Sequence, residues 1–162
     1  MSEITRLIDE LEREHSGDPW HGSPMLQILE GVNAATAARK PFRDAHSIWE
    51  LVLHVTGWKR EVARRTMGAP AGEPANGDWP AVGEPTEARW NAALDDLNAA
   101  HLELIAAVNA LPEARLFEPT NDPRNRPLGS GVSYYVLLHG AVQHDVYHAG
   151  QIAVVKKLSS TE

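Results

Sequence analysis

Two histidines one helical turn apart, His144 and His148, have the spacing in this sequence that points most directly to chemistry. Side chains four positions apart lie on one face of a helix, so the two imidazoles can reach a single metal ion. Leu137 and Ala141 share that face, which places the pair on an apolar stripe directed at other helices. His139 lies about 140° away around the helix and is not suited to join them. The pair therefore predicts part of a metal site that needs a third ligand.

His54 is the best third ligand, because it occupies the apolar face of an earlier helical segment, between Leu51 and Trp58. Packing this segment against the last one would bring three imidazole nitrogens to one point. Three neutral imidazoles and a water are typical of catalytic zinc, and they also suit nickel or ferrous iron. A water at the open position has a lowered pKa and becomes a nucleophile near neutral pH.

Three other interpretations of the histidines stay open. A lone histidine on an apolar face is usually a hydrogen-bonded core residue, although three of them need three separate hydrogen-bond partners. The segment from His144 to His148 is close to the zincin motif His-Glu-x-x-His, but Asp145 is one carbon shorter than the glutamate base of that motif. The segment from Glu12 to His15 matches half of a di-iron site, whose other carboxylates are missing. The residues favour the single three-histidine site.

Five further residues are candidates for a pocket wall or for support of the ligands: Trp58, His101, Asp145, Tyr147 and Gln151. His101 could be a fourth ligand, a pocket acid or base, or a core residue. Asp145 could orient a ligand histidine or form a salt bridge. Gln151 shares the ligand face and can hold a ligand by a hydrogen bond. Trp58 and Tyr147 flank the ligand positions, and Tyr147 could present its hydroxyl group to a substrate.

The helices that must position these residues follow from hydrophobic periodicity and capping signals. They are expected at residues 3–15, after Ser23 and Pro24, within 33–40, at 48–67 behind a Ser47–Glu50 capping box, at 87–111 behind Thr86, and from Ser130 or Ser133 to about Leu158. The helix from Thr86 carries a seam that steps by four and three from Trp90 to Leu111, which predicts close antiparallel packing.

Loops rich in proline and glycine at 68–85 and 117–131 separate the long helices, and Trp79 is expected to hold the first loop to them. The sequence shows no strand pattern. The fold class is therefore all-α, a four-helix bundle with long irregular inter-helix loops.

Composition limits the class of protein. The 162 residues suffice for one domain, 1–162, with a substantial core. A net charge of -7 argues against a nucleic-acid partner, which needs a basic face. The first residues form a charged amphipathic segment rather than a signal, and no run is apolar enough for a membrane span. Zero cysteines exclude disulfides, thiolate ligands and a cysteine nucleophile. A cytoplasmic location is the default expectation.

The pattern from Ser47 to Trp58, followed by the one from Leu137 to Ile152, resembles the DinB-like superfamily over nearly the whole chain. Its most specific part is His-x-x-x-His-x-Gly-Gln coupled to one histidine on an earlier helix. The resemblance implies a four-helix bundle related in fold to thiol-dependent S-transferases and mycothiol-dependent isomerases. It also implies that His54, His144 and His148 bind one divalent metal ion, namely nickel, zinc or iron. A low-molecular-weight thiol is a further cofactor to expect, while no substrate is implied.

Two functions are expected from this sequence. The first is a metal-dependent enzyme, a hydrolase or thiol S-transferase that acts on a small molecule. The second is a non-catalytic metal-binding or interaction module, and a homodimer is plausible for either. Three histidines at helix breaks, namely His15, His21 and His46, are expected at the surface, and Lys59, Arg60, Arg64 and Arg65 are interpreted as a solvated helix face.

Overall fold

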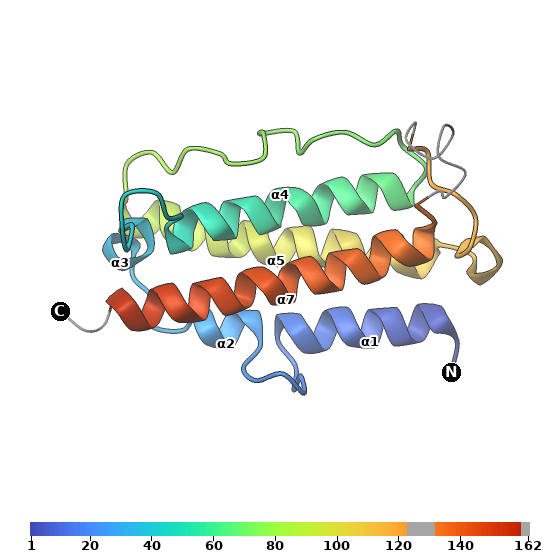
Figure 1. The fold of residues 1–162 in the computed structure, drawn as a ribbon, viewed down its shortest axis with the longest axis horizontal. Coiled ribbons are helices and arrows are strands. Elements are labelled where there is room, and N and C mark those ends of the chain that lie inside the picture. The colour runs from blue at the N-terminus through green and yellow to red at the C-terminus, as the bar shows by residue number, and fades with distance from the viewer. Residues whose placement is uncertain (123–131, 160–162) are drawn as a thin grey trace.

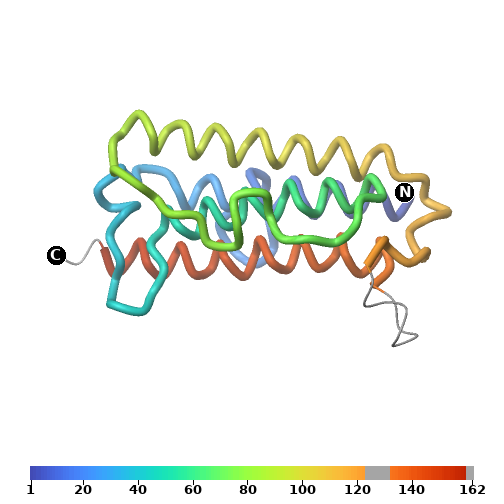
Figure 2. Tube along the Cα trace, turned by 90° about the horizontal axis from the view of Figure 1, so that it is seen from above, coloured from blue at the N-terminus to red at the C-terminus, as the bar shows by residue number. Residues whose placement is uncertain are grey.

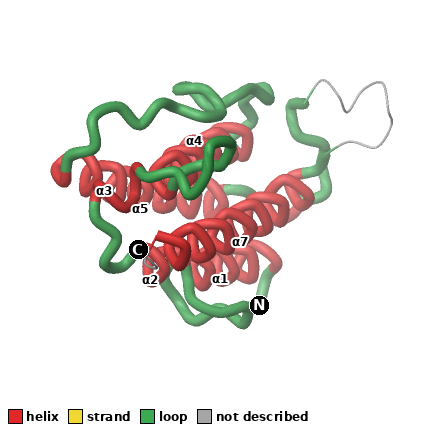
Figure 3. Tube along the Cα trace, turned by 60° about the vertical axis from the view of Figure 1, so that its left-hand side comes forward, coloured by secondary structure: helices red, strands yellow, loops and turns green. Residues whose placement is uncertain are grey.

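The computed structural model describes residues 1–122 and 132–159. Within these ranges the regular structure is helical and contains no strand, apart from an isolated bridge between Pro119 and Ser133 (Figure 3). The prediction of an all-α fold is confirmed. None of the described helices combines the length and the apolarity that a membrane crossing requires.

Four long helices lie alongside one another: α1 (Glu3–His15), α4 (Ile48–Thr66), α5 (Glu87–Ala110) and α7 (Tyr134–Ser159) (Figure 1). Helix α4 packs against α5 and α7, and α1 contacts the same two helices. The short helices α2 (Met25–Leu29) and α3 (Ala34–Ala38) lead from α1 to α4, and a 3-10 turn, η1 (Glu113–Arg115), follows α5.

The helices begin largely where the capping signals place them. Ser47 and Glu50 form the expected capping box at the start of α4, and the Thr86 side chain accepts a hydrogen bond from the backbone of Arg89. Ser133 accepts one from the Val136 backbone in the first turn of α7. Helix α2 differs from the expectation, because Pro24 precedes its first residue and no side chain caps it.

Helices α4 and α5 run in the same direction, because the chain returns along the full length of α4 before α5 begins (Figures 1 and 2). The connection, residues 67–86, crosses over α4 in both views and is long enough for this return. The antiparallel packing predicted for α5 therefore holds against α1 but is wrong for α4, its most extensive neighbour. Seam periodicity specifies which face is buried and does not specify helix direction.

The core consists of two apolar clusters with a polar layer between them. One cluster includes Leu51, Val55 and Leu97, and the other includes Val62 and Leu104. The intervening positions on the long helices carry buried ionisable side chains: Glu14, His15, His54, Lys59, His101, Asp145 and His148. This polar layer contains the candidate site.

Candidate metal centre

His54 on α4 meets His144 and His148 on α7, as the sequence predicts. One ligand atom from each lies within 4.8 Å of the others, and the Nε2 atoms of His54 and His144 are 3.0 Å apart. Two nitrogens bound to one metal ion at about 2.1 Å can be at most about 4.2 Å apart, so the His54–His144 pair meets that limit. His54 and His148 are buried, whereas His144 is partly exposed.

The opposite ring nitrogen of each histidine has a partner that orients the ring. Nδ1 of His54 donates to the backbone carbonyl of Asp78 at 2.7 Å, and Nδ1 of His148 donates to Oε1 of Gln151 at 2.9 Å. These bonds leave the two Nε2 atoms as lone-pair donors. Nδ1 of His144 lies 3.6 Å from a carboxylate oxygen of Asp145, which favours the same tautomer. Lone pairs facing each other at 3.0 Å repel, so a proton or a cation belongs between them, and the residues fit a metal ion.

Burial keeps His54 and His148 neutral, which is the form that binds metal. Desolvation lowers the pKa of His54, although the bond to Asp78 opposes the shift. Desolvation also lowers the pKa of His148 to about 4, with the nearby His144 adding to the effect. At neutral pH both side chains therefore need no deprotonation before an ion can bind.

The loop between α4 and α5 forms one side of the site. The Trp79 ring stacks on His54 with ring centroids 4.0 Å apart, and it also stacks on His46 with ring centroids 3.5 Å apart. The Asp78 side chain accepts a hydrogen bond from Trp58 at 2.7 Å, while its carbonyl holds His54. The structure therefore agrees with the expectation that Trp79 holds this loop to the helices. Asp78 was not among the residues suggested by the sequence, because a carbonyl in an irregular loop leaves no pattern.

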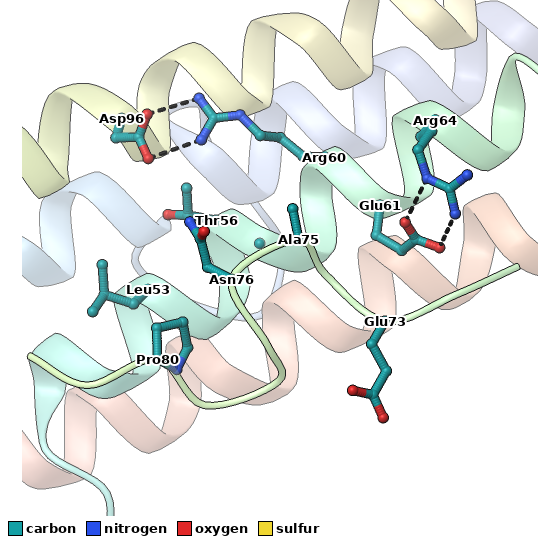
Figure 4. A pocket seen from close by; sticks show the side chains of 11 residues that line it. Leu53, Thr56, Arg60, Glu61, Arg64, Glu73, Ala75, Asn76, Pro80 and Asp96 are labelled. Atoms are coloured by element: carbon teal, nitrogen blue, oxygen red, sulfur yellow. Dashed lines mark hydrogen bonds and ion pairs between the residues drawn. The ribbon is translucent and has the colours of Figure 1, made fainter. Parts of the chain in front are cut away.

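Gly57 allows the loop to lie this close to α4. A Cβ atom at this position would stand 3.0 Å from the Cβ of Pro74. Farther along, the loop and helices enclose a cavity of about 320 Å³ lined by Arg60, Asp96 and Asn76 among others (Figure 4). The ion pairs of Arg60 with Asp96 and of Arg64 with Glu61 border this cavity, which contains no residue of the histidine group.

Comparison with known proteins gives the family and a similar fold. Residues 20–152 match the family model of the DinB superfamily, a range that includes all three histidines. The chain belongs to the DinB superfamily. Its fold is also similar to the crystal structure of the conserved protein of locus from Enterococcus faecalis, with a TM-score of 0.72 and 16% identity over 100% of this chain and 99% of that chain. That identity shows the fold alone. No curated protein matches the sequence.

Among the other predicted site residues of this DinB-superfamily chain, Trp58 and Gln151 lie beside the histidines, and Asp145 supports one of them. The Trp58 ring centroid lies 6.3 Å from that of His54 and 6.2 Å from that of His144. Tyr147 contacts the edge of His148 but is 64% exposed, so it lies on the surface of α7. His101 does not join the three histidines and belongs to a second buried cluster.

That second cluster surrounds Lys59, whose side chain is 1% exposed. The ammonium group lies 2.5 Å from Asp145, 3.0 Å from Glu14 and 3.4 Å from Nδ1 of His101. The interpretation of Lys59 as part of a solvated face is therefore wrong, whereas Arg60 and Arg64 are partly exposed. A spacing signal was present, because Lys59 falls between Val55 and Val62 on the buried stripe of α4.

His15 also differs from the expectation of a surface residue. It is buried, stacks on His101 with ring centroids 3.9 Å apart, and bonds to Asn98 at 2.8 Å. Burial lowers the pKa of His15 to about 4 and that of His101 to about 3, and the charge of Lys59 adds to both effects. His46, expected at the surface, is partly exposed and stacked on Trp79.

Glu14, His15 and His101 form a second group with the spacing of metal ligands. The Lys59 ammonium already supplies a cation to two of them, so electrostatics disfavour a divalent ion there. Burial and the charge of Asp145 raise the pKa of Glu14 despite Lys59. Burial alone would also raise the pKa of Asp145, but Lys59 holds it below its usual value. Asp145 therefore stays charged and connects the Lys59 cluster to His144.

Proposed function

We propose that this chain is a four-helix bundle of the DinB type that binds one divalent ion through His54, His144 and His148. The candidate metals are nickel, zinc and iron, all of which accept imidazole ligands. The observation that carries the proposal is the convergence of three imidazoles, each with a hydrogen-bond acceptor near its other ring nitrogen.

We further propose that the protein is a metal-dependent enzyme, a hydrolase or thiol S-transferase acting on a small molecule. A bound divalent ion with an open position activates a water or a thiol by lowering its pKa. The chain contributes rigid support, because Asp78 in the loop and Asp145 and Gln151 on α7 hold the histidine rings. It also contributes access, since His144 is partly exposed and lines a cavity of about 250 Å³. The absence of cysteine means that any thiol must come from a separate molecule.

A non-catalytic metal-binding role is the second candidate, and the burial of the site favours it. His54 and His148 are each about nine-tenths buried or more, and Trp79 covers His54. Closed surroundings are typical of structural metal ions. The exposed face of α7, which includes Val136, Tyr147 and Val154, is largely uncharged and supports the further proposal of a homodimer. A cytoplasmic location, the default expectation from the sequence, is also part of the proposal.

Elemental analysis of purified untagged protein tests the site. One metal ion per chain is expected, with loss in His54→Ala and in His148→Ala. His139→Ala is the matched control, because His139 is on the same helix but outside the histidine group. Unchanged metal content in both ligand variants would end the proposal.

Turnover distinguishes the two roles. Metal-loaded protein is incubated with several thiols plus an electrophile panel, and separately with activated esters. Activity above that of His144→Ala supports the enzyme. Stoichiometric metal without activity in any of these assays supports the binding role. Light scattering measures the mass of the particle and tests the homodimer.

A further inference from the structure

A cavity of about 250 Å³ lies between α4 and α7 and includes one ligand histidine in its wall. Its apolar lining comes from Trp58, Val62, Val132, Val136, Leu137 and Ala141, and its polar lining from Lys59, Arg65, His144 and Asp145. A benzene ring occupies a cavity of about 150 Å³, so this space holds one ring with a short side chain. The occupant must therefore be small and largely apolar.

Three side chains define a direction across this cavity. The guanidinium of Arg65 lies over the Trp58 ring, 5.5 Å from its centroid, and the same ring lies 6.2 Å from that of His144. Trp58 thus separates a cationic end from the end at the metal ligands. A flat or aliphatic ligand lying along Trp58 would place one terminus at the cationic end and the other at the metal ligands.

The charges at the two ends differ. Asp145, which stays charged, neutralises Lys59, so Lys59 offers no free positive charge. Glu61 pairs with both Arg64 and Arg65, at 2.8 and 2.7 Å, so one carboxylate faces two guanidinium groups and one positive charge remains.

Arg65 also keeps a free hydrogen-bonding edge. It donates through Nε to Glu61 and through Nη2 to the Gly72 carbonyl, while Nη1 has no hydrogen-bond partner in the described part of the chain. Arg65 is held rigidly by these bonds, and a carboxylate is the group that its free edge and surplus charge suit best.

We propose that this cavity is the substrate pocket and that it takes a small monocarboxylic acid with an apolar body. The carboxylate contacts Arg65, the body lies along Trp58 and the aliphatic wall, and the far end approaches His144. The assignment of this ligand as substrate rests on the proposed function, whereas carboxylate binding by Arg65 requires no metal.

Two glycines on the exposed face of α7 provide a matched pair of variants. Gly140 lines the cavity and Gly150 does not, and a Cβ atom at either position would meet nothing within 4 Å. Gly140→Leu should fill the cavity without distorting the helix, and Gly150→Leu adds the same side chain elsewhere. Arg65→Gln removes the charge but retains polar hydrogen atoms toward the Gly72 carbonyl.

Calorimetric titration of the full chain with phenylacetate, and with the uncharged phenylacetamide, tests the proposal. Phenylacetate should bind at least about tenfold more tightly than the amide, on the usual strength of a charge-assisted hydrogen bond. Gly140→Leu should abolish binding of both compounds, and Gly150→Leu should bind as the natural chain does. Arg65→Gln should reduce the affinity for phenylacetate to that for the amide while leaving the amide unchanged.

The proposal is overturned if neither compound binds, if both bind equally, or if Gly140→Leu leaves binding intact. Metal content measured on the same samples separates this proposal from the metal site. Phenylacetate binding by a chain that never retains metal would refute the metal proposal and support the carboxylate pocket. One ion per chain without phenylacetate binding would refute the pocket alone.

Discussion

Replacing Lys59 by methionine tests whether its ammonium group holds the polar layer together. The change retains the length of the side chain and removes the charge that faces Asp145 at 2.5 Å and Glu14 at 3.0 Å. Removing one partner of a buried ion pair costs about 3–5 kcal/mol, because the other charge is left without compensation. For a domain of this size, that corresponds to a fall in Tm of roughly 6–20 °C.

The neighbouring Arg60 provides the control. It pairs with Asp96 and Glu103 in partly exposed positions, where ion pairs contribute about 0–1 kcal/mol. Arg60→Met should therefore change the free energy of unfolding by about 1 kcal/mol or less. The two adjacent basic residues have similar pairing partners. Their methionine variants should nevertheless differ severalfold in the loss of unfolding free energy, because only Lys59 is buried.

The pH dependence makes this prediction more specific. Without Lys59, the folded-state pKa of Asp145 should rise above the ordinary 3.8 of aspartate, and the pKa of Glu14, already above 4.5, should rise further, because burial and mutual repulsion are no longer opposed. A raised folded-state pKa contributes stability at low pH that is lost as the pH rises through that value. The loss of unfolding free energy in Lys59→Met relative to the natural chain should therefore be smallest near pH 5 and increase toward pH 8.

Denaturant unfolding of metal-free protein, monitored by circular dichroism from pH 5 to pH 8, measures both effects. Adding Asp145→Asn to Lys59→Met should recover part of the loss at pH 8, because it removes a buried charge that Lys59 no longer compensates. A cost for Lys59→Met no larger than that for Arg60→Met, or a deficit independent of pH, would refute this account of the polar layer.

Three further outcomes follow from the site. Gln151→Ala should weaken metal affinity by about 10–100-fold in competition with a chelator, because His148 loses the partner of its Nδ1; unchanged affinity would contradict that role. The free energy of unfolding should fall between pH 6.5 and about pH 4. Buried His15 and His101 have folded-state pKa values of about 4 and 3, so the unfolded chain binds protons first as the pH falls. In His15→Gln the free energy of unfolding should decrease less steeply over this pH range. Trp79→Ala should weaken metal binding and speed proteolysis of the loop that Trp79 holds against α4. An unchanged digestion pattern would contradict the role of the stacked contact in holding the loop.

The sequence predicted the helices and the histidine group well, for identifiable reasons. Helix caps such as Ser47 and Thr86 are local signals, and the structure uses both. The approach of His54 to His144 and His148 followed from their positions on apolar stripes that must pack together. Whether an ion occupies the group stays a prediction for elemental analysis.

The remaining differences involve information that is not local. The direction of α5 relative to α4 depends on the path of the loop, and either direction can bury the same seam. Lys59 and His15 were placed at the surface because charge and a nearby helix end usually indicate exposure. Their burial depends on partners from other helices, Asp145 and Asn98, which no single segment reveals.

The hydrogen bond from His54 to the carbonyl of Asp78 couples metal affinity to the ordering of the loop over α4. Ordering that loop costs conformational entropy, and an ion that requires the oriented ring must offset this cost. Substitutions that stiffen or loosen residues 67–86 can therefore shift the dissociation constant without altering a ligand. Homologues with identical histidines can thus differ in the rate at which they exchange the metal ion. The difference would come from a loop that need not contact the metal.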